Sequence, residues 1–175
     1  MQREMRGYLQ IYTGNGKGKS TAAFGLALRA AGAGMSVYIA QFVKGRNYSE
    51  ITAVRQHVPQ ITIRQFGRGC FIVGKPTDED VSAAREGLAV VSEVLTSGEY
   101  DMVILDEATI AIYYDLFTVG ELIEILKTRA AGCEVVVTGR YAPEELIEVA
   151  DLVTEMREVK HYYRQGIEAR EGIEY

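Results

Sequence analysis

The chain has 175 residues, of which 47% are hydrophobic and 25% are charged, so it can bury the core of one folded domain. Its formal net charge is −5 and its lysines and arginines are scattered, which argues against a surface for duplex nucleic acid. Cys70 and Cys133 lie far apart and form no metal-type pair, and no stretch suits a signal peptide or a membrane span. These features predict one domain over residues 1–175 in a reducing cytoplasm, with no nucleic-acid or membrane partner.

Short apolar runs alternate with longer helical patterns along the chain. In chain order we expect a strand at 8–13, a helix at 19–33, a strand at 36–42, a helix at 50–58, a strand at 62–66, a helix at 77–97, a strand at 102–105, a helix from 118 to about 132, a strand at 134–138, a helix beginning at Pro143 and a strand at 152–156. The glycine-rich stretch 67–76 predicts a loop, and 161–175 has room for a short helix.

Two of the expected helices begin with the spacing of a capping box. Thr77 is followed three residues later by Asp80, and Thr118 is followed by Glu121. Because strands and helices alternate throughout, the sequence predicts an α/β fold with a mostly parallel sheet of about six strands and helices on both faces. Ligands of such sheets bind beyond the carboxyl ends of the strands.

A glycine-rich loop lies between the first expected strand and its helix. Glycines at alternate positions let successive backbone N–H groups point inward as an anion nest, and the helix that follows adds its positive dipole end. Lys19 supplies a charge for the outer phosphates, and the Ser20 hydroxyl can bind Mg²⁺. Thr13 stands where a strict phosphate-loop pattern has its first glycine. The loop residues expected to bind ATP are Gly14, Asn15, Gly16, Lys17, Gly18, Lys19, Ser20 and Thr21.

A second signal is the apolar run 102–105, which ends in Asp106 and Glu107. Two carboxylates at the end of a buried strand suit Mg²⁺, which prefers hard oxygen ligands and keeps several waters. Either acid could bind the metal directly while the other acts through water. Together with the loop, this pair predicts a P-loop NTPase fold of the RecA-like kind and a site for a nucleoside triphosphate and Mg²⁺.

The sequence offers no clear residue to activate an attacking oxygen, as hydrolases and kinases with such loops require. The two histidines, His57 and His161, stand in no motif. Considered as a whole, the chain resembles the ATP:corrinoid adenosyltransferases of the CobA/CobO/BtuR type. The resemblance covers nearly the whole chain and is carried by 14–25 (GNGKGKSTAAFG), 41–45 (QFVKG), 105–107 (LDE), 137–140 (VTGR), 150–155 (ADLVTE), 159–161 (VKH) and 172–175 (GIEY).

The resemblance implies an alkyl transfer in which Co(I) of a reduced corrinoid attacks the 5′ carbon of ATP and triphosphate leaves. In this family the triphosphate is reversed in the loop relative to ordinary P-loop enzymes. Lys17 and Lys19 would then grip the leaving group as its charge develops. The resemblance also implies that Arg29 and Arg140 reach the nucleotide, and that Ser20 and Glu107 hold Mg²⁺. Co(I) is a strong nucleophile, so the missing general base fits this reaction.

The corrinoid side departs from the family pattern. Relatives place aromatic residues beneath the corrin ring, and the matching positions here are Cys70, Phe71 and Ile72, in a chain without tryptophan. Phe71 and Ile72 could pack against the ring or merely anchor the loop, and Cys70 is expected to be a small apolar residue. Some relatives close an N-terminal segment over the corrinoid, whereas about six residues precede the first strand here, so a lid is expected elsewhere or not at all.

Two other classes of function stay open from the residues. One is a P-loop ATPase or nucleoside kinase, and the other is a non-catalytic nucleotide or corrinoid carrier. The resemblance further implies a homodimer and an electron-donor reductase as partner. The sequence does not specify the corrinoid, the reductant, or a role in de novo synthesis or salvage.

Overall fold

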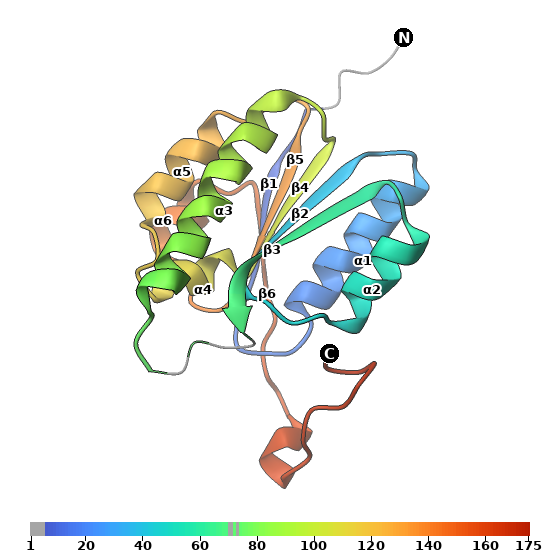
Figure 1. Ribbon diagram of the computed structural model, residues 1–175, viewed down its shortest axis with the longest axis vertical. Coiled ribbons are helices and arrows are strands. Elements are labelled where there is room, and N and C mark those ends of the chain that lie inside the picture. Colours follow the sequence, from blue (N-terminus) through green and yellow to red (C-terminus); the bar gives the residue numbers. More distant parts are fainter. Residues whose placement is uncertain (1–5, 70–71, 73) are drawn as a thin grey trace.

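The computed structural model describes residues 6–69, 72 and 74–175. Its strands and helices alternate along the chain (Figure 1). In chain order they are β1 Leu9–Thr13, α1 Lys19–Gly32, β2 Val37–Lys44, α2 Ser49–His57, β3 Ile61–Gly69, α3 Asp78–Ser97, β4 Met102–Asp106, α4 Ala108–Tyr113, α5 Val119–Lys127, β5 Glu134–Thr138, α6 Glu144–Glu148, β6 Leu152–Glu155 and the 3₁₀ helix η1 Tyr162–Gln165.

The six strands form one sheet in the order β3-β2-β4-β5-β1-β6, and every pair is parallel. In the register, Ile11 of β1 lies between Val137 of β5 and Val153 of β6. All carboxyl ends therefore meet at one edge of the sheet. The expected α/β fold with a parallel sheet of about six strands is confirmed, and it is consistent with a P-loop NTPase-like domain.

Alternating side chains of the strands build two cores, one on each face of the sheet. Val37 and Ile39 of β2 pack in a cluster with the buried alanines of α1 and with Ile51 of α2. Tyr38 and Phe42 point to the other face and pack in a cluster with residues of α3, α5 and α6. Figure 1 shows α1 and α2 on one side of the sheet and α3 to α6 on the other. The apolar strands β2, β4 and β5 are thus buried on both faces, as is typical of parallel sheets.

Both predicted capping boxes are present at the starts of α3 and α5. Two expectations about the elements were wrong, and one helix was missed. The predicted loop at 67–76 begins too early, because β3 continues to Gly69, which pairs with Lys44 of β2. The helix α5 ends at Lys127, well before 132, because the backbone N–H of Ala130 leaves the helix and bonds the Leu95 carbonyl of α3. The short helix α4 was not expected, since its six residues are too few to show a helical period.

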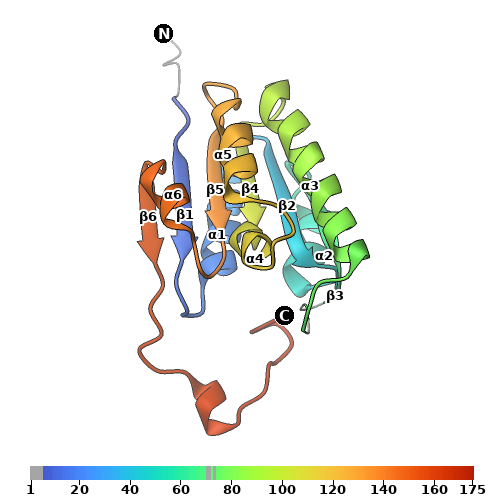
Figure 2. The ribbon, with the colours of Figure 1, turned by 90° about the vertical axis from the view of Figure 1, so that its left-hand side faces the viewer.

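The segment after β6 passes beneath the carboxyl edge of the sheet, forms η1, and returns toward α2 (Figure 2). The Ser49 hydroxyl at the start of α2 bonds the Tyr175 carbonyl at 3.1 Å. We call residues 157–175 the tail. Across the described ranges, no helix has the length and apolar character needed to cross a bilayer.

Candidate active site

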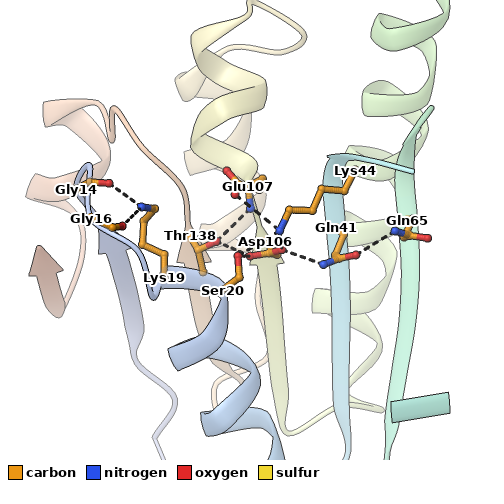
Figure 3. Close-up of polar contacts among 10 residues, drawn as sticks. All are labelled: Gly14, Gly16, Lys19, Ser20, Gln41, Lys44, Gln65, Asp106, Glu107 and Thr138. Carbon is orange, nitrogen blue, oxygen red and sulfur yellow. Dashed lines mark hydrogen bonds and ion pairs between the residues drawn. The ribbon is translucent and has the colours of Figure 1, made fainter. Parts of the chain in front are cut away.

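The carboxyl ends of β1, β2, β4 and β5 bring polar side chains together at one edge of the sheet, as Figure 3 shows. The glycine-rich loop follows β1, and Lys44, Asp106 and Thr138 are the last residues of the other three strands. The predicted phosphate loop and the predicted acidic strand end therefore lie in one site.

The loop has the backbone that its glycines predict. Gly14 has a φ of 98° and Gly18 a φ of 123°, conformations that L side chains rarely adopt. A Cβ at Gly14 or Gly16 would also come within 2.6 Å of the Met156 carbonyl oxygen. The loop thus lies against the segment after β6, and the Gly16 N–H donates to Met156 at 2.6 Å.

Lys19 folds back over this loop. Its Nζ donates to the carbonyl oxygens of Gly14 at 2.8 Å and Gly16 at 2.7 Å (Figure 3). The residue is buried, and burial, followed by the positive charge of Arg140, lowers the pKa of Lys19. The ammonium is thus held by neutral carbonyls in a place where an anion would interact with it strongly.

Asp106 is the centre of the polar cluster and has no exposed surface. Its Oδ1 accepts hydrogen bonds from Ser20 and Thr138, both at 2.7 Å. Its Oδ2 accepts from Gln41 at 3.0 Å and from the Lys44 ammonium at 2.9 Å. Burial alone would raise the pKa of Asp106, but the Lys44 charge and these hydrogen bonds hold it below its ordinary value. The carboxylate is therefore ionised and strongly held.

Glu107 differs from its neighbour in both backbone and charge. It has a φ of 59°, a left-handed conformation that is uncommon for a residue with a side chain, directly after β4. Its N–H donates to the Thr138 hydroxyl at 3.1 Å. Burial and the nearby charge of Asp106 raise the pKa of the Glu107 carboxyl. The two acids thus have distinct environments although they are adjacent in sequence.

Three residues of this cluster were missed as site residues by the sequence reasoning: Gln41, Lys44 and Thr138. Each lies at or near the carboxyl end of a strand, where ligands of parallel sheets bind. That position was the signal that could have identified them. Burial alone would lower the pKa of Lys44, but the charges of Asp106 and Glu107 and its hydrogen bond to Asp106 raise it.

The other predicted loop residues face outward. The Lys17 ammonium contacts the tail, at 2.7 Å from both the Glu174 carboxylate and the Ile173 carbonyl. The Asn15 side-chain oxygen accepts from the N–H of Glu158 at 3.0 Å. Thr21 lies in the first turn of α1 and is exposed. The tail is thus attached to the loop at two points.

The two predicted arginines lie in different places. Arg140 follows β5 and lines a hollow of about 560 Å³ beside the loop, together with Gly14 and Asn15. Arg29 lies in the last turn of α1, about 15 Å along the helix from Lys19 at 1.5 Å per residue. The structure brings Arg140 to the loop, whereas α1 carries Arg29 away from it.

The predicted corrinoid residues follow β3 in the sequence. Cys70 and Phe71 lie outside the described residues. Ile72 is partly buried and packs against the core cluster of α3, and its carbonyl accepts from the Tyr114 hydroxyl at 3.3 Å. This geometry favours the interpretation that Ile72 anchors the loop over the one in which it packs against a corrin ring.

Comparison with known proteins identifies the family of the chain. Residues 5–175 match the family described as ATP:corrinoid adenosyltransferase BtuR/CobO/CobP. The chain is 36% identical to a corrinoid adenosyltransferase of Pseudomonas aeruginosa, over 99% of this chain and 86% of the relative. It is 38% identical to one of a Sinorhizobium species, over 97% and 81%, and 36% identical to one of Escherichia coli K12, over 99% and 88%. The chain belongs to the ATP:corrinoid adenosyltransferase family.

Proposed function

We propose that this corrinoid adenosyltransferase uses the loop at residues 14–20 and the Asp106 cluster to transfer the 5′-deoxyadenosyl group of ATP to the Co(I) of a reduced corrinoid. Cobalt supplies the electron pair for the new Co–C bond, and the bond between the 5′ carbon and its oxygen breaks. The electrons of that bond leave with triphosphate, and the cobalt becomes Co(III). The observation that carries the proposal is a buried lysine on a glycine loop, next to a buried, ionised carboxylate at the same sheet edge.

The residues of the chain act on the leaving group. The backbone N–H groups of the loop and the Lys19 ammonium stabilise the negative charge that develops on the departing oxygen. Lys19 exchanges its two carbonyl contacts for phosphate oxygens. Arg140, at the hollow beside the loop, adds a second positive charge. Lys17 is proposed as a further contact, which requires its ion pair with Glu174 to open.

Mg²⁺ is proposed to accompany the nucleotide. The hydroxyl of Ser20 and the carboxylates of Asp106 and Glu107 are the hard oxygen donors that this ion prefers. The cation position between them already attracts a positive group, since the Lys44 ammonium lies 2.9 Å from Asp106 and 3.8 Å from Glu107. The residues therefore fit the ion, which when bound would neutralise charge on the triphosphate. Ser20 and one of the two carboxylates would hold it directly, and the other carboxylate would orient its waters.

Several finer features are part of the same proposal. Phe71 would contribute to the surface under the corrin ring. The chain would act in the cytoplasm as a homodimer, and a reductase would deliver the electron that produces Co(I). Light scattering on the purified protein tests the dimer directly, and a monomer would contradict it.

The test of the reaction is an anaerobic assay with chemically reduced cobalamin, ATP and Mg²⁺. The expected result is the spectral change from Co(I) to light-sensitive adenosylcobalamin, with triphosphate as the phosphate product. Lys19→Ala should abolish it, while Lys127→Ala, which changes an exposed lysine paired with Glu124, should leave it intact. Release of γ-phosphate without adenosylation would instead indicate an ATPase or kinase, and tight corrinoid binding without turnover a carrier.

A further inference from the structure

Lys44 contacts all three of the side chains that the proposed function assigns to Mg²⁺. Its Nζ lies 2.9 Å from Asp106 Oδ2, 3.8 Å from Glu107 Oε1 and 3.2 Å from Ser20 Oγ. Figure 3 shows its side chain reaching from the end of β2 toward Asp106. Mg²⁺ needs its oxygen ligands at about 2.0–2.1 Å, so an ammonium and a metal ion cannot share these oxygens in this arrangement.

The backbone of β2 is built to direct Lys44 to this place. Alternation along the strand would put Lys44 on the same face as Phe42, against α3, and Val43 on the face of Gln41. Instead, Val43 packs in the same cluster as Phe42, and Lys44 points to the side where Gln41 bonds Asp106. The register between β2 and β3 shifts at this point, between Phe42 and Lys44.

The irregularity has a conformational cost. Val43 has a φ of 64°, and a β-branched residue in the left-handed region is a genuine outlier. Neighbouring glycines make room for it, since a Cβ at Gly67 would meet the Val43 carbonyl carbon at 2.4 Å. A Cβ at Gly45 would likewise meet the Gly67 carbonyl oxygen at 2.4 Å. Strained backbone that persists only through its surroundings is a common property of functional sites.

We infer that Lys44 is a built-in counter-cation that occupies the divalent-cation position of the nucleotide-free enzyme and is displaced when Mg²⁺ arrives with ATP. The inference rests on the proposed metal site. While no metal is bound, the Lys44 ammonium neutralises the negative charge of Asp106. The carboxylate, which has no exposed surface, is therefore never left as an unpaired buried charge. The flexible four-carbon stem of lysine and its 15% exposed side chain allow it to leave.

The experiment measures metal affinity without nucleotide or corrinoid, so it does not depend on turnover. Mn²⁺ binding is followed by electron paramagnetic resonance for the wild type, for Lys44→Met and for Lys127→Met as the matched control. Removing the competing ammonium should tighten Mn²⁺ binding by roughly 100-fold or more in Lys44→Met, judged from the strength of broken buried ion pairs. The control should bind as the wild type does, and Lys44→Met/Asp106→Asn should lose the gain.

A second readout is thermal unfolding. Lys44→Met should have a lower melting temperature than the wild type, and Mg²⁺ should raise that melting temperature again. The melting temperature of the wild type should change little when Mg²⁺ is added without nucleotide. If Lys44→Met does not fold, Lys44→Gln, which keeps a hydrogen-bond donor near Asp106, serves in its place. Equal Mn²⁺ affinity of wild type and variant would overturn the inference and leave the metal site standing. Failure of the wild type to bind Mn²⁺ even with ATP would overturn both.

Discussion

The substitution Thr138→Val tests how the Asp106 cluster is held together. The change preserves the shape of the side chain but removes a hydroxyl that has no exposed surface. That hydroxyl donates to Asp106 at 2.7 Å and accepts from the Glu107 N–H at 3.1 Å. A hydrogen bond to a charged group contributes about 1.5–3 kcal/mol, and an orphaned buried donor costs about 1–3 kcal/mol. Because the two losses share one group, we expect a total of about 3 kcal/mol.

Urea denaturation at pH 7 measures this loss. With a slope of about 2 kcal/mol per molar urea, the midpoint should fall by roughly 1.5 M while the slope stays the same. Thr138→Ser keeps the hydroxyl and should lose much less. Thr154→Val makes the same chemical change at an exposed position of β6 and should stay within about 0.5 kcal/mol of the wild type.

A loss below about 0.5 kcal/mol for Thr138→Val would refute this reasoning. It would mean that Asp106 and the Glu107 N–H find other partners at little expense. The cluster would then be adaptable rather than fixed by the end of β5.

Two further predictions concern positions away from the site. Gly87→Ala should lower the stability by about 1–3 kcal/mol, or the melting temperature by about 5 °C, because the added Cβ would lie 2.7 Å from Phe66 and 2.8 Å from Phe42. Gly25→Ala, where the added Cβ meets open space, should instead raise the stability by up to about 1 kcal/mol. Equal effects of the two substitutions on the melting temperature would contradict the packing argument. Burial raises the pKa of the Cys133 thiol to about 11, so at pH 8 only about one thiol in a thousand is ionised, and iodoacetamide should modify Cys133 only after unfolding, as peptide mapping by mass spectrometry would detect.

Two parts of the site, the loop after β1 and the end of β4, were predicted from sequence. The loop after β1 has glycines whose backbone requirements are local, and the run 102–105 ending in Asp106 is typical of a buried strand. These features depend on residues close together in the chain, so a sequence pattern contains them. The parallel sheet followed from the alternation of strands and helices.

Other features depend on contacts between distant segments, which a local pattern does not contain. The position of Lys44 depends on a register shift between β2 and β3 and on the left-handed Val43. The contact of Lys17 with Glu174 joins residues that are 157 positions apart. Arg29 was expected at the nucleotide from a resemblance alone, although it lies ten residues after Lys19, and the structure places it in the last turn of α1.

The sheet order also has a consequence for how the chain folds. The strand β1, which leads into the loop, pairs only with β5 and β6 among the described strands, at separations of 126 to 142 residues. These pairings form late because long loops must close first, and a ribosome delivers β5 and β6 only near the end of synthesis. The strand β1 therefore stays without its sheet partners during most of synthesis. The proposed nucleotide site thus becomes complete only when nearly the whole domain has emerged.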